Sequence, residues 1–78
     1  LGSVRLRAPA AVSATAVRIF EAAGRQVRVL ELSLRAQGWR EAEWDGRDGA
    51  GIEVPAGVYW ARAGWSGHEV ASRVVLVR

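Results

Sequence analysis

Short runs in which apolar and polar residues alternate recur along the chain, and clusters of turn residues separate them. Alternation with a period of two places one set of side chains on each face of a β-strand. Val17 and Ile19 thus share one face, and Arg18 lies on the other. In the first part of the chain the pattern predicts strands over Ser3 to Ala8, Ala14 to Phe20 and Gln26 to Glu31.

The segment between the second and third predicted strands contains residues typical of a β-hairpin turn. Gly24, within Glu21 to Arg25, stands where a tight turn needs a left-handed residue. We therefore expect the two strands to pair antiparallel. In the third strand, alternation places Val27 and Val29 on one face and Arg28 and Leu30 on the other.

The middle of the chain gives mixed signals. Leu32 to Gly38 shows neither period and fits a loop or a short edge strand. Trp39 to Trp44 contains residues that favour a helix, yet this segment is too short for a stable helix between a glycine and an Asp-Gly pair. We predict a strand there, with Arg40, Ala42 and Trp44 on one face.

Two further strands complete the predicted set. Gly57 to Trp65 is rich in β-branched and aromatic residues, and Ser66 with Gly67 reverses the chain into His68 to Arg78. Within that last strand, Val74 to Val77 is apolar on both faces. Such a run is typical of a strand inside a sheet or covered on both sides.

Six or seven short strands separated by turn signals predict an all-β fold, either a β-sandwich or a small barrel. With 78 residues the chain makes one domain with a modest core. The chain has no cysteine, so the core must hold the fold without disulfides or thiolate metal sites.

The stretch from Trp44 to Tyr59 has the composition of a tight corner between strands. Asp45 and Asp48 can each accept a hydrogen bond from the backbone two residues further on. Arg25 and Arg47 each flank a Gly-rich turn, and a guanidinium can grip a carboxylate with two hydrogen bonds. We predict that these arginines brace the loops through the acids. Glycines that can take positive φ in the corner are Gly46, Gly49 and Gly51.

Eleven arginines, no lysine and eight acidic residues give a net charge of +3. The arginines are spread singly through the predicted strands, whereas sites for nucleic acid or lipid headgroups gather cations into a run or patch. No apolar run approaches the length of about 20 residues that spans a bilayer. We therefore expect neither nucleic-acid binding nor membrane insertion.

The carboxylates match no catalytic or metal-binding pattern. No register of the EF-hand calcium-loop template fits Asp45, Asp48 and Glu53. Glu41 and Glu43 lie on the solvent face of their predicted strand, and no nucleophile or oxyanion hole accompanies them. We predict no catalytic residue, no metal and no cofactor.

Four tryptophans are many for a chain of this length. Trp44 and Tyr59 are placed to enter the core on either side of the corner, but the remaining indoles are harder to bury together. Coplanar exposed indoles stack on sugar rings, which would make a glycan-binding surface. Alternatively, the indoles fill a core otherwise built from Ala and Val, or pack against a neighbouring domain. The candidate ligand or partner contacts are Trp39, Trp60 and Trp65.

The order of these signals resembles the immunoglobulin-like domain of the flagellar hook-capping (FlgD-type) protein and the related C-terminal sorting domains of type IX secretion. The resemblance spans residues 16 to 78 and rests on VRIFEAAGRQVRVL, AQGWREAEWDGRDGAGIEVPAGVYWARA and RVVLVR. Ala61 and Ala63 stand where the family usually has bulkier residues, so Trp60 and Trp65 are expected to fill that volume. The residues that carry the resemblance are Gly24, Arg25, Trp44, Asp45, Gly46, Asp48, Gly51, Pro55, Gly57 and Tyr59.

The resemblance implies that residues 1–78 form a single immunoglobulin-like antiparallel β-sandwich of six to seven strands, at the C-terminal end of a larger exported bacterial protein. It implies a non-catalytic module for type IX sorting and secretion or for extracellular assembly, located outside the cell or on its surface after passage through the periplasm. Its partners would be secretion machinery, a neighbouring domain or assembly subunits. Two alternatives stay open: a carbohydrate-binding module that tethers an upstream hydrolase, and a structural domain of a flagellar cap or extracellular filament.

Overall fold

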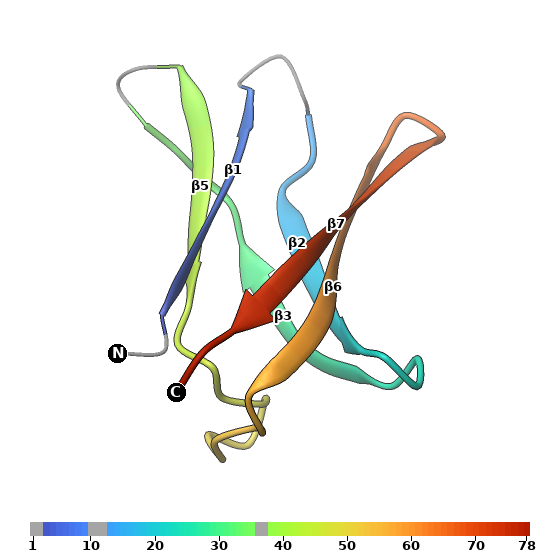
Figure 1. Cartoon of the computed structure of the whole chain (residues 1–78). Coiled ribbons are helices and arrows are strands. Elements are labelled where there is room, and N and C mark those ends of the chain that lie inside the picture. Colours follow the sequence, from blue (N-terminus) through green and yellow to red (C-terminus); the bar gives the residue numbers. More distant parts are fainter. Residues whose placement is uncertain (1–2, 10–12, 36–37) are drawn as a thin grey trace.

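The computed structural model describes residues 3–9, 13–35 and 38–78, and the regular structure in these ranges is β-strand (Figure 1). The described residues hold no helix long and apolar enough to cross a bilayer. Trp39 to Trp44 is a strand, as predicted, and Ser33–Leu34 forms a short edge strand. The strands are β1 (Val4–Pro9), β2 (Ala16–Glu21), β3 (Gln26–Glu31), β4 (Ser33–Leu34), β5 (Trp39–Trp44), β6 (Gly57–Trp65) and β7 (His68–Leu76).

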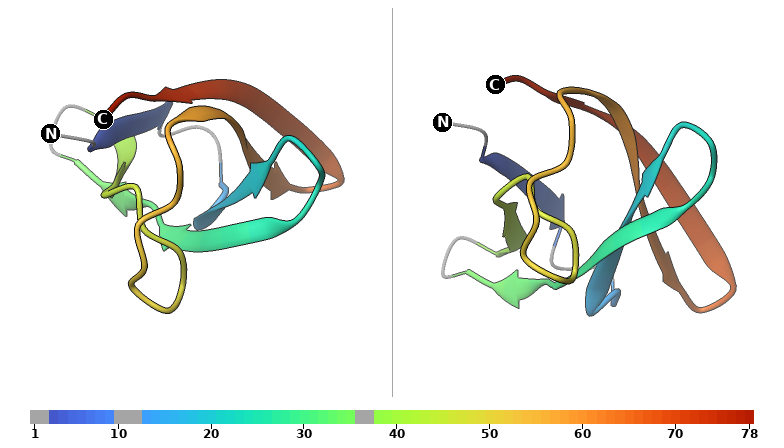
Figure 2. Two further views of the ribbon diagram at one scale, coloured as in Figure 1. Left: turned by 60° about the horizontal axis from the view of Figure 1, so that its bottom comes forward. Right: turned by 90° about the horizontal axis from the view of Figure 1, so that it is seen from below.

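The strands form two antiparallel sheets that face each other (Figures 1 and 2). The three-stranded sheet has the order β1-β5-β4, and the four-stranded sheet has the order β3-β2-β6-β7. The predicted β2–β3 hairpin is present, and Gly24 in its turn has a φ of 98°. The predicted fold class, an all-β antiparallel sandwich, is confirmed. β5 and β6 follow each other in the chain but lie in different sheets.

The core lies between the sheets and is built mainly from the faces that alternation predicts. Val17 and Ile19 of β2 are buried, and Arg18 between them is exposed. Tyr59 and Ala61 of β6 are buried in the same way. Full burial of one large apolar side chain contributes about 1.5–3 kcal/mol to stability. The buried hydrophobic residues of the described part are Ala14, Val17, Ile19, Val27, Leu30, Leu32, Ala42, Trp44, Val54, Tyr59, Ala61, Val74 and Leu76.

Strand β3 departs from strict alternation. Val27 and Leu30 are both buried and Val29 is 49% exposed, so the prediction that Val27 and Val29 share a face is wrong. The β2–β3 register shifts directly after the pair Ile19–Arg28. A β-bulge of this kind places an extra residue in one strand and reverses the faces of the side chains that follow it.

The structure places β7 at the edge of the four-stranded sheet. The prediction that the last strand lies inside a sheet or is covered on both sides is therefore wrong. Val74 and Leu76 face the core, whereas Val75 and Val77 are 53% and 69% exposed. Its apolar run thus combines one buried face with one bare face. An apolar run alone does not distinguish a central strand from an uncovered edge strand.

The hairpin between β6 and β7 depends on the conformation of Ser66. This residue has a φ of 47°, and Gly67 follows with a φ of 78°. Positive φ at both positions defines a two-residue turn that favours Asn-Gly. We expect Ser66→Asn to raise the free energy of unfolding by about 0.5 kcal/mol, and Ser66→Val to lower it by about 1 kcal/mol. Urea denaturation measures both changes, and equal stability of the two variants would contradict this turn.

Candidate functional site

The corner loop, defined here as residues 45–56, contains the most specific part of the sequence motif and carries the chain from β5 to β6 across the two sheets (Figure 2). The Val54 amide donates to the Gly46 carbonyl at 3.0 Å, which closes the loop on itself. The Gly49 amide donates to the Val27 carbonyl of β3, also at 3.0 Å. The corner loop is therefore bonded both internally and to the edge of the four-stranded sheet.

Trp44 and Tyr59 stand at the two ends of the corner loop and pack it against the core. Their rings meet edge to face with centroids 5.1 Å apart, a favoured geometry for aromatic pairs. Trp44 is fully buried, and its Nε1 donates to the Arg47 carbonyl at 2.9 Å. The Tyr59 hydroxyl donates to the Pro55 carbonyl at 2.6 Å, and burial raises the pKa of Tyr59. The prediction that both aromatics enter the core is confirmed.

Asp45 holds the first reversal of the corner loop. Its Oδ1 accepts hydrogen bonds from the Arg47 amide at 3.0 Å and from the Arg28 guanidinium at 2.9 Å. The same Arg28 nitrogen donates to the Arg47 carbonyl at 2.9 Å. Desolvation acts to raise the pKa of Asp45, but the Arg47 hydrogen bond and the Arg28 charge outweigh it and lower the pKa. Asp45 is thus both a turn cap and a counter-ion.

Asp48 holds the second reversal. Its Oδ1 accepts hydrogen bonds from the amides of Ala50 at 2.9 Å and Ile52 at 3.0 Å. Its own carbonyl accepts a hydrogen bond from the Gly51 amide, and Gly51 has a φ of 84°, where a side chain would be strained. The predicted capping of the corner by its two aspartates is confirmed.

The last residue described, Arg78, also reaches the corner loop. It donates to the carbonyl of Val54 from Nε at 2.8 Å and to the carbonyl of Gly46 from Nη2. Its guanidinium lies 3.6 Å from the Glu53 carboxylate, which Arg47 approaches at the same distance. Sequence reasoning missed Arg78, because a contact between residues so far apart in the chain leaves no local pattern.

The prediction that Arg25 and Arg47 brace the loops by pairing with Asp45 or Asp48 is wrong. Arg25 pairs with Glu21 at 3.2 Å within its own hairpin, and Arg47 pairs with Glu53. The guanidinium on Asp45 belongs to Arg28. Arg28 is paired across the sheet with a core residue, so its side chain starts from the inner face of the edge strand β3 and reaches the corner.

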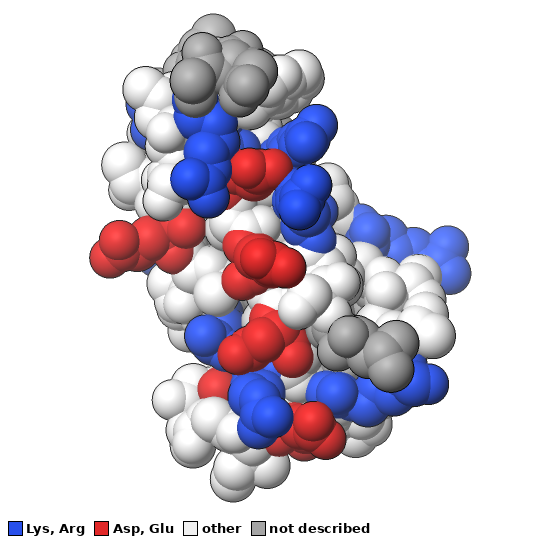
Figure 3. Space-filling view, turned by 90° about the vertical axis from the view of Figure 1, so that its left-hand side faces the viewer, with Lys and Arg blue, Asp and Glu red and all other residues white. Residues whose placement is uncertain are grey.

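A second charged cluster lies on the outer face of the three-stranded sheet, where acids and arginines are interleaved (Figure 3). Glu41 accepts hydrogen bonds from Arg7 and Arg35 at 3.2 Å each and lies 3.5 Å from Arg5. The Arg7 hydrogen bond lowers the pKa of Glu41, burial opposes this, and the charges of Arg7 and Arg5 support it. The prediction that Glu41 lies in solvent is therefore wrong, since its side chain is only 16% exposed.

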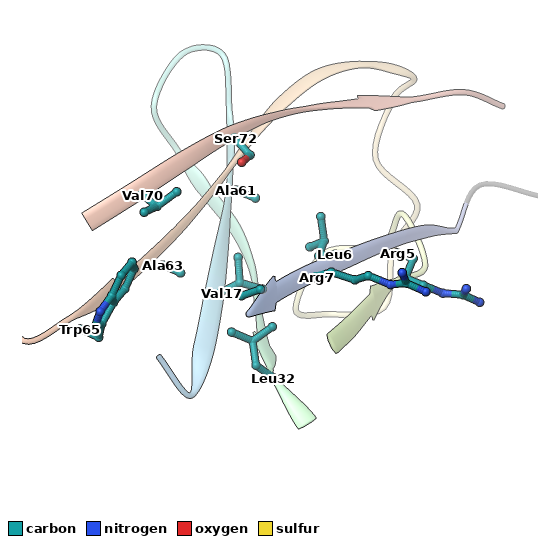
Figure 4. A pocket seen from close by; sticks show the side chains of 11 residues that line it. Arg5, Leu6, Arg7, Val17, Leu32, Ala61, Ala63, Trp65, Val70 and Ser72 are labelled. Atoms are coloured by element: carbon teal, nitrogen blue, oxygen red, sulfur yellow. The ribbon is translucent and has the colours of Figure 1, made fainter. Parts of the chain in front are cut away.

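The three candidate contact tryptophans lie on different surfaces. Trp39 is 42% exposed on the outer face of β5, and Trp60 is 39% exposed on the outer face of β6 in the other sheet. Trp65 packs against the core on the same side of β6 as Ala63 (Figure 4). Trp65 thus fills volume beside the alanines as expected, whereas Trp60 does not. The three indoles do not form one coplanar platform.

The surface of the described residues is hollowed in several places, among them a groove and a second hollow. A groove of about 280 Å³ lies between β1 and the β6–β7 hairpin, and Leu6, Val17 and Val70 are among its mainly apolar walls (Figure 4). A second hollow of about 340 Å³ includes Phe20 and Arg62, whose guanidinium lies 4.8 Å over the ring. Among the described residues, no hydroxyl in either hollow is hydrogen-bonded to a carboxylate. The same residues contain no cluster of three or more acidic or imidazole side chains that could hold a metal ion.

The fold and the corner loop define an immunoglobulin-like β-sandwich whose most specific motif is structural. The model of the FlgD Ig-like domain family matches residues 1–67, and the chain belongs to this family of structural, non-catalytic domains. The match includes β1 to β6 and ends at the turn before β7. Comparison with the curated proteins and with the solved structures gave no match. The chain is thus a flagellar hook-related immunoglobulin-like module.

Removal of the Asp45 carboxylate tests its role in the corner loop. We expect Asp45→Ala to lower the free energy of unfolding by about 1–2 kcal/mol, because the Arg47 amide and the Arg28 guanidinium both lose an acceptor. Glu43→Ala is the matched control: Glu43 is exposed on the neighbouring strand β5, and its loss should change stability by less than about 0.5 kcal/mol. Chemical denaturation of both variants gives the comparison. Equal effects would show that Asp45 does not hold the corner.

Acid should destabilise the protein through Asp45 and Glu41. Folding lowers both pKa values from their ordinary values of 3.8 and 4.5. The stability from each carboxylate is therefore present above its ordinary pKa and is lost as the pH falls through the lower, folded-state value. Asp45→Asn and Glu41→Gln should each flatten the fall in unfolding free energy below pH 4.5, measured by denaturation across a pH series. Slopes identical to that of the parent would contradict this assignment.

Proposed function

We propose that this chain is a non-catalytic assembly module of an exported bacterial protein, and that it joins protein subunits outside the cell or at its surface. Membership of the FlgD Ig-like domain family supports this role. The main observation in support of a non-catalytic role concerns the polar side chains at the corner loop. Asp45, Asp48 and Arg28 all form hydrogen bonds with the backbone of that loop. These groups build a rigid connection and do not converge on an open cleft.

A role in type IX sorting is the second function that we propose for the same module. In that case the secretion machinery is the partner, and the module directs its parent protein through the periplasm to the surface. Exposed Trp39 and Trp60 offer apolar contacts for a partner on either sheet. Aromatic side chains of this size are enriched at the centres of protein interfaces.

Deletion of residues 1–78 from the encoding gene, in the bacterium that carries it, separates the two roles. If the module serves assembly, the shortened protein still reaches the outside of the cell, where surface protease digestion detects it. It no longer joins the protein complex to which the full-length protein belongs, and native gel electrophoresis detects this loss. If it serves sorting, the product stays in the periplasm. Glu43→Ala in the intact protein is the control and should change neither readout. An unchanged location together with an unchanged complex would contradict the proposed function.

A further inference from the structure

Three of the four sheet edges carry features that hinder pairing with another strand. β4 has two residues, and β1 ends at Pro9, which has no amide hydrogen to donate. β3 contains the bulge, and the charged Arg28 stands on its inner face. Short strands, prolines, bulges and inward-pointing charges are the devices by which natural sheets block edge-to-edge association.

The fourth edge, β7, has none of these features. Its nine residues pair with β6 without a register shift and include no proline. The inner face of β7 carries no aspartate, glutamate or arginine, and Val70 on that face is 49% exposed. Figure 2 shows β7 along the outer side of the four-stranded sheet, away from β2. β7 is therefore the edge at which a further strand can be added.

The hairpin turn determines which backbone groups of β7 are free. In a two-residue hairpin the closing pair, here Trp65 and His68, exchanges both backbone hydrogen bonds, and bonded pairs then alternate along the strands. Every second residue of β7 from His68 onward thus bonds to β6. The residues between them, including Glu69, Ala71 and Arg73, direct their amide and carbonyl groups to the free edge.

The charges beside this edge are self-complementary. Glu69 and Arg73 both lie on the outer face of β7, about 13 Å apart along the strand. Within the described ranges neither side chain takes part in an ion pair or a side-chain hydrogen bond. If two copies pair antiparallel about Ala71, Glu69 of each copy faces Arg73 of the other. The free amide and carbonyl of Ala71 then bond to those of its counterpart.

We propose that β7 is a self-association edge at which a second copy of this chain adds its own β7, antiparallel and centred on Ala71. The pairing joins two four-stranded sheets into one continuous sheet, with main-chain hydrogen bonds and two Glu69–Arg73 pairs across the junction. Val70 of each copy, half exposed in the single chain, gains Ser72 of the other as its cross-strand neighbour. This inference deepens the proposed function, because it rests on an assembly role and names the assembling partner.

Charge exchange at the edge tests the proposal by sedimentation velocity of the 78-residue chain over a concentration series. The parent should form dimers. Arg73→Glu and Glu69→Arg should each raise the dimer dissociation constant about tenfold or more, because like charges then oppose each other twice. An equimolar mixture of the two variants should restore dimers, since every cross-strand pair is again opposite in charge. Glu31→Arg changes the net charge by the same amount as Glu69→Arg, and should dimerise like the parent.

A second variant tests the backbone contribution. Ala71→Pro removes an amide hydrogen that faces the free edge and leaves the hydrogen bonds to β6 in place, so this variant should be monomeric with an unchanged circular dichroism spectrum. A monomeric parent, or single charge variants that dimerise as tightly as the parent, would overturn the proposal. If the parent is monomeric but deletion of the module still disperses its complex, the proposed function stands and the partner is a different protein.

Discussion

The crossing from one sheet to the other is the constraint on which this small sandwich depends. The chain must leave β5 in one layer and enter β6 in the other, and the backbone groups of the crossing must find partners on the way. The edge-to-face contact of Trp44 with Tyr59 fixes the two ends of this crossing. The buried indole then orients the loop above it, because it donates to the Arg47 carbonyl. These contacts hold the two sheets together at the end of the sandwich where the corner loop lies, without a disulfide.

The same constraint explains why the charged residues of this chain do structural work. The carboxylate of Asp45 and the guanidinium of Arg28 meet on the loop backbone, and Arg78 closes over it from the far end of the chain. In a domain of this size, side chains used in this way leave little to build a reactive site. Away from the corner loop, the outer faces of the sheets and the edge of β7 lie at the surface.

Local patterns were enough to predict much of the fold. Alternation placed Val17 and Ile19 in the core, and turn chemistry identified the reversals held by Asp45 and Asp48, because both depend on residues within a few positions. The resemblance to the FlgD-type domain added the two-layer arrangement, which the family match supports.

Features that depend on distant parts of the chain were missed or wrong. The bulge that brings Val27 into the core arises from the register of two strands, and alternation within one strand does not encode it. The arginines around Glu41 arrive from β1 and from the segment after β4, so its low exposure could not be read from its own strand. The apolar end of β7 fitted a central strand equally well, because sheet order is a property of the whole chain.

Amide hydrogen exchange, followed by NMR, tests most directly whether the corner loop is a rigid part of the sandwich. The amides of Arg47, Gly49 and Val54 are bonded to Asp45, to β3 and across the loop itself. The account predicts that they exchange as slowly as the core amides of β2, which open only when the whole domain unfolds. Exchange as fast as that of Gly67 in the exposed β6–β7 turn would show that the corner opens independently, and would contradict the account.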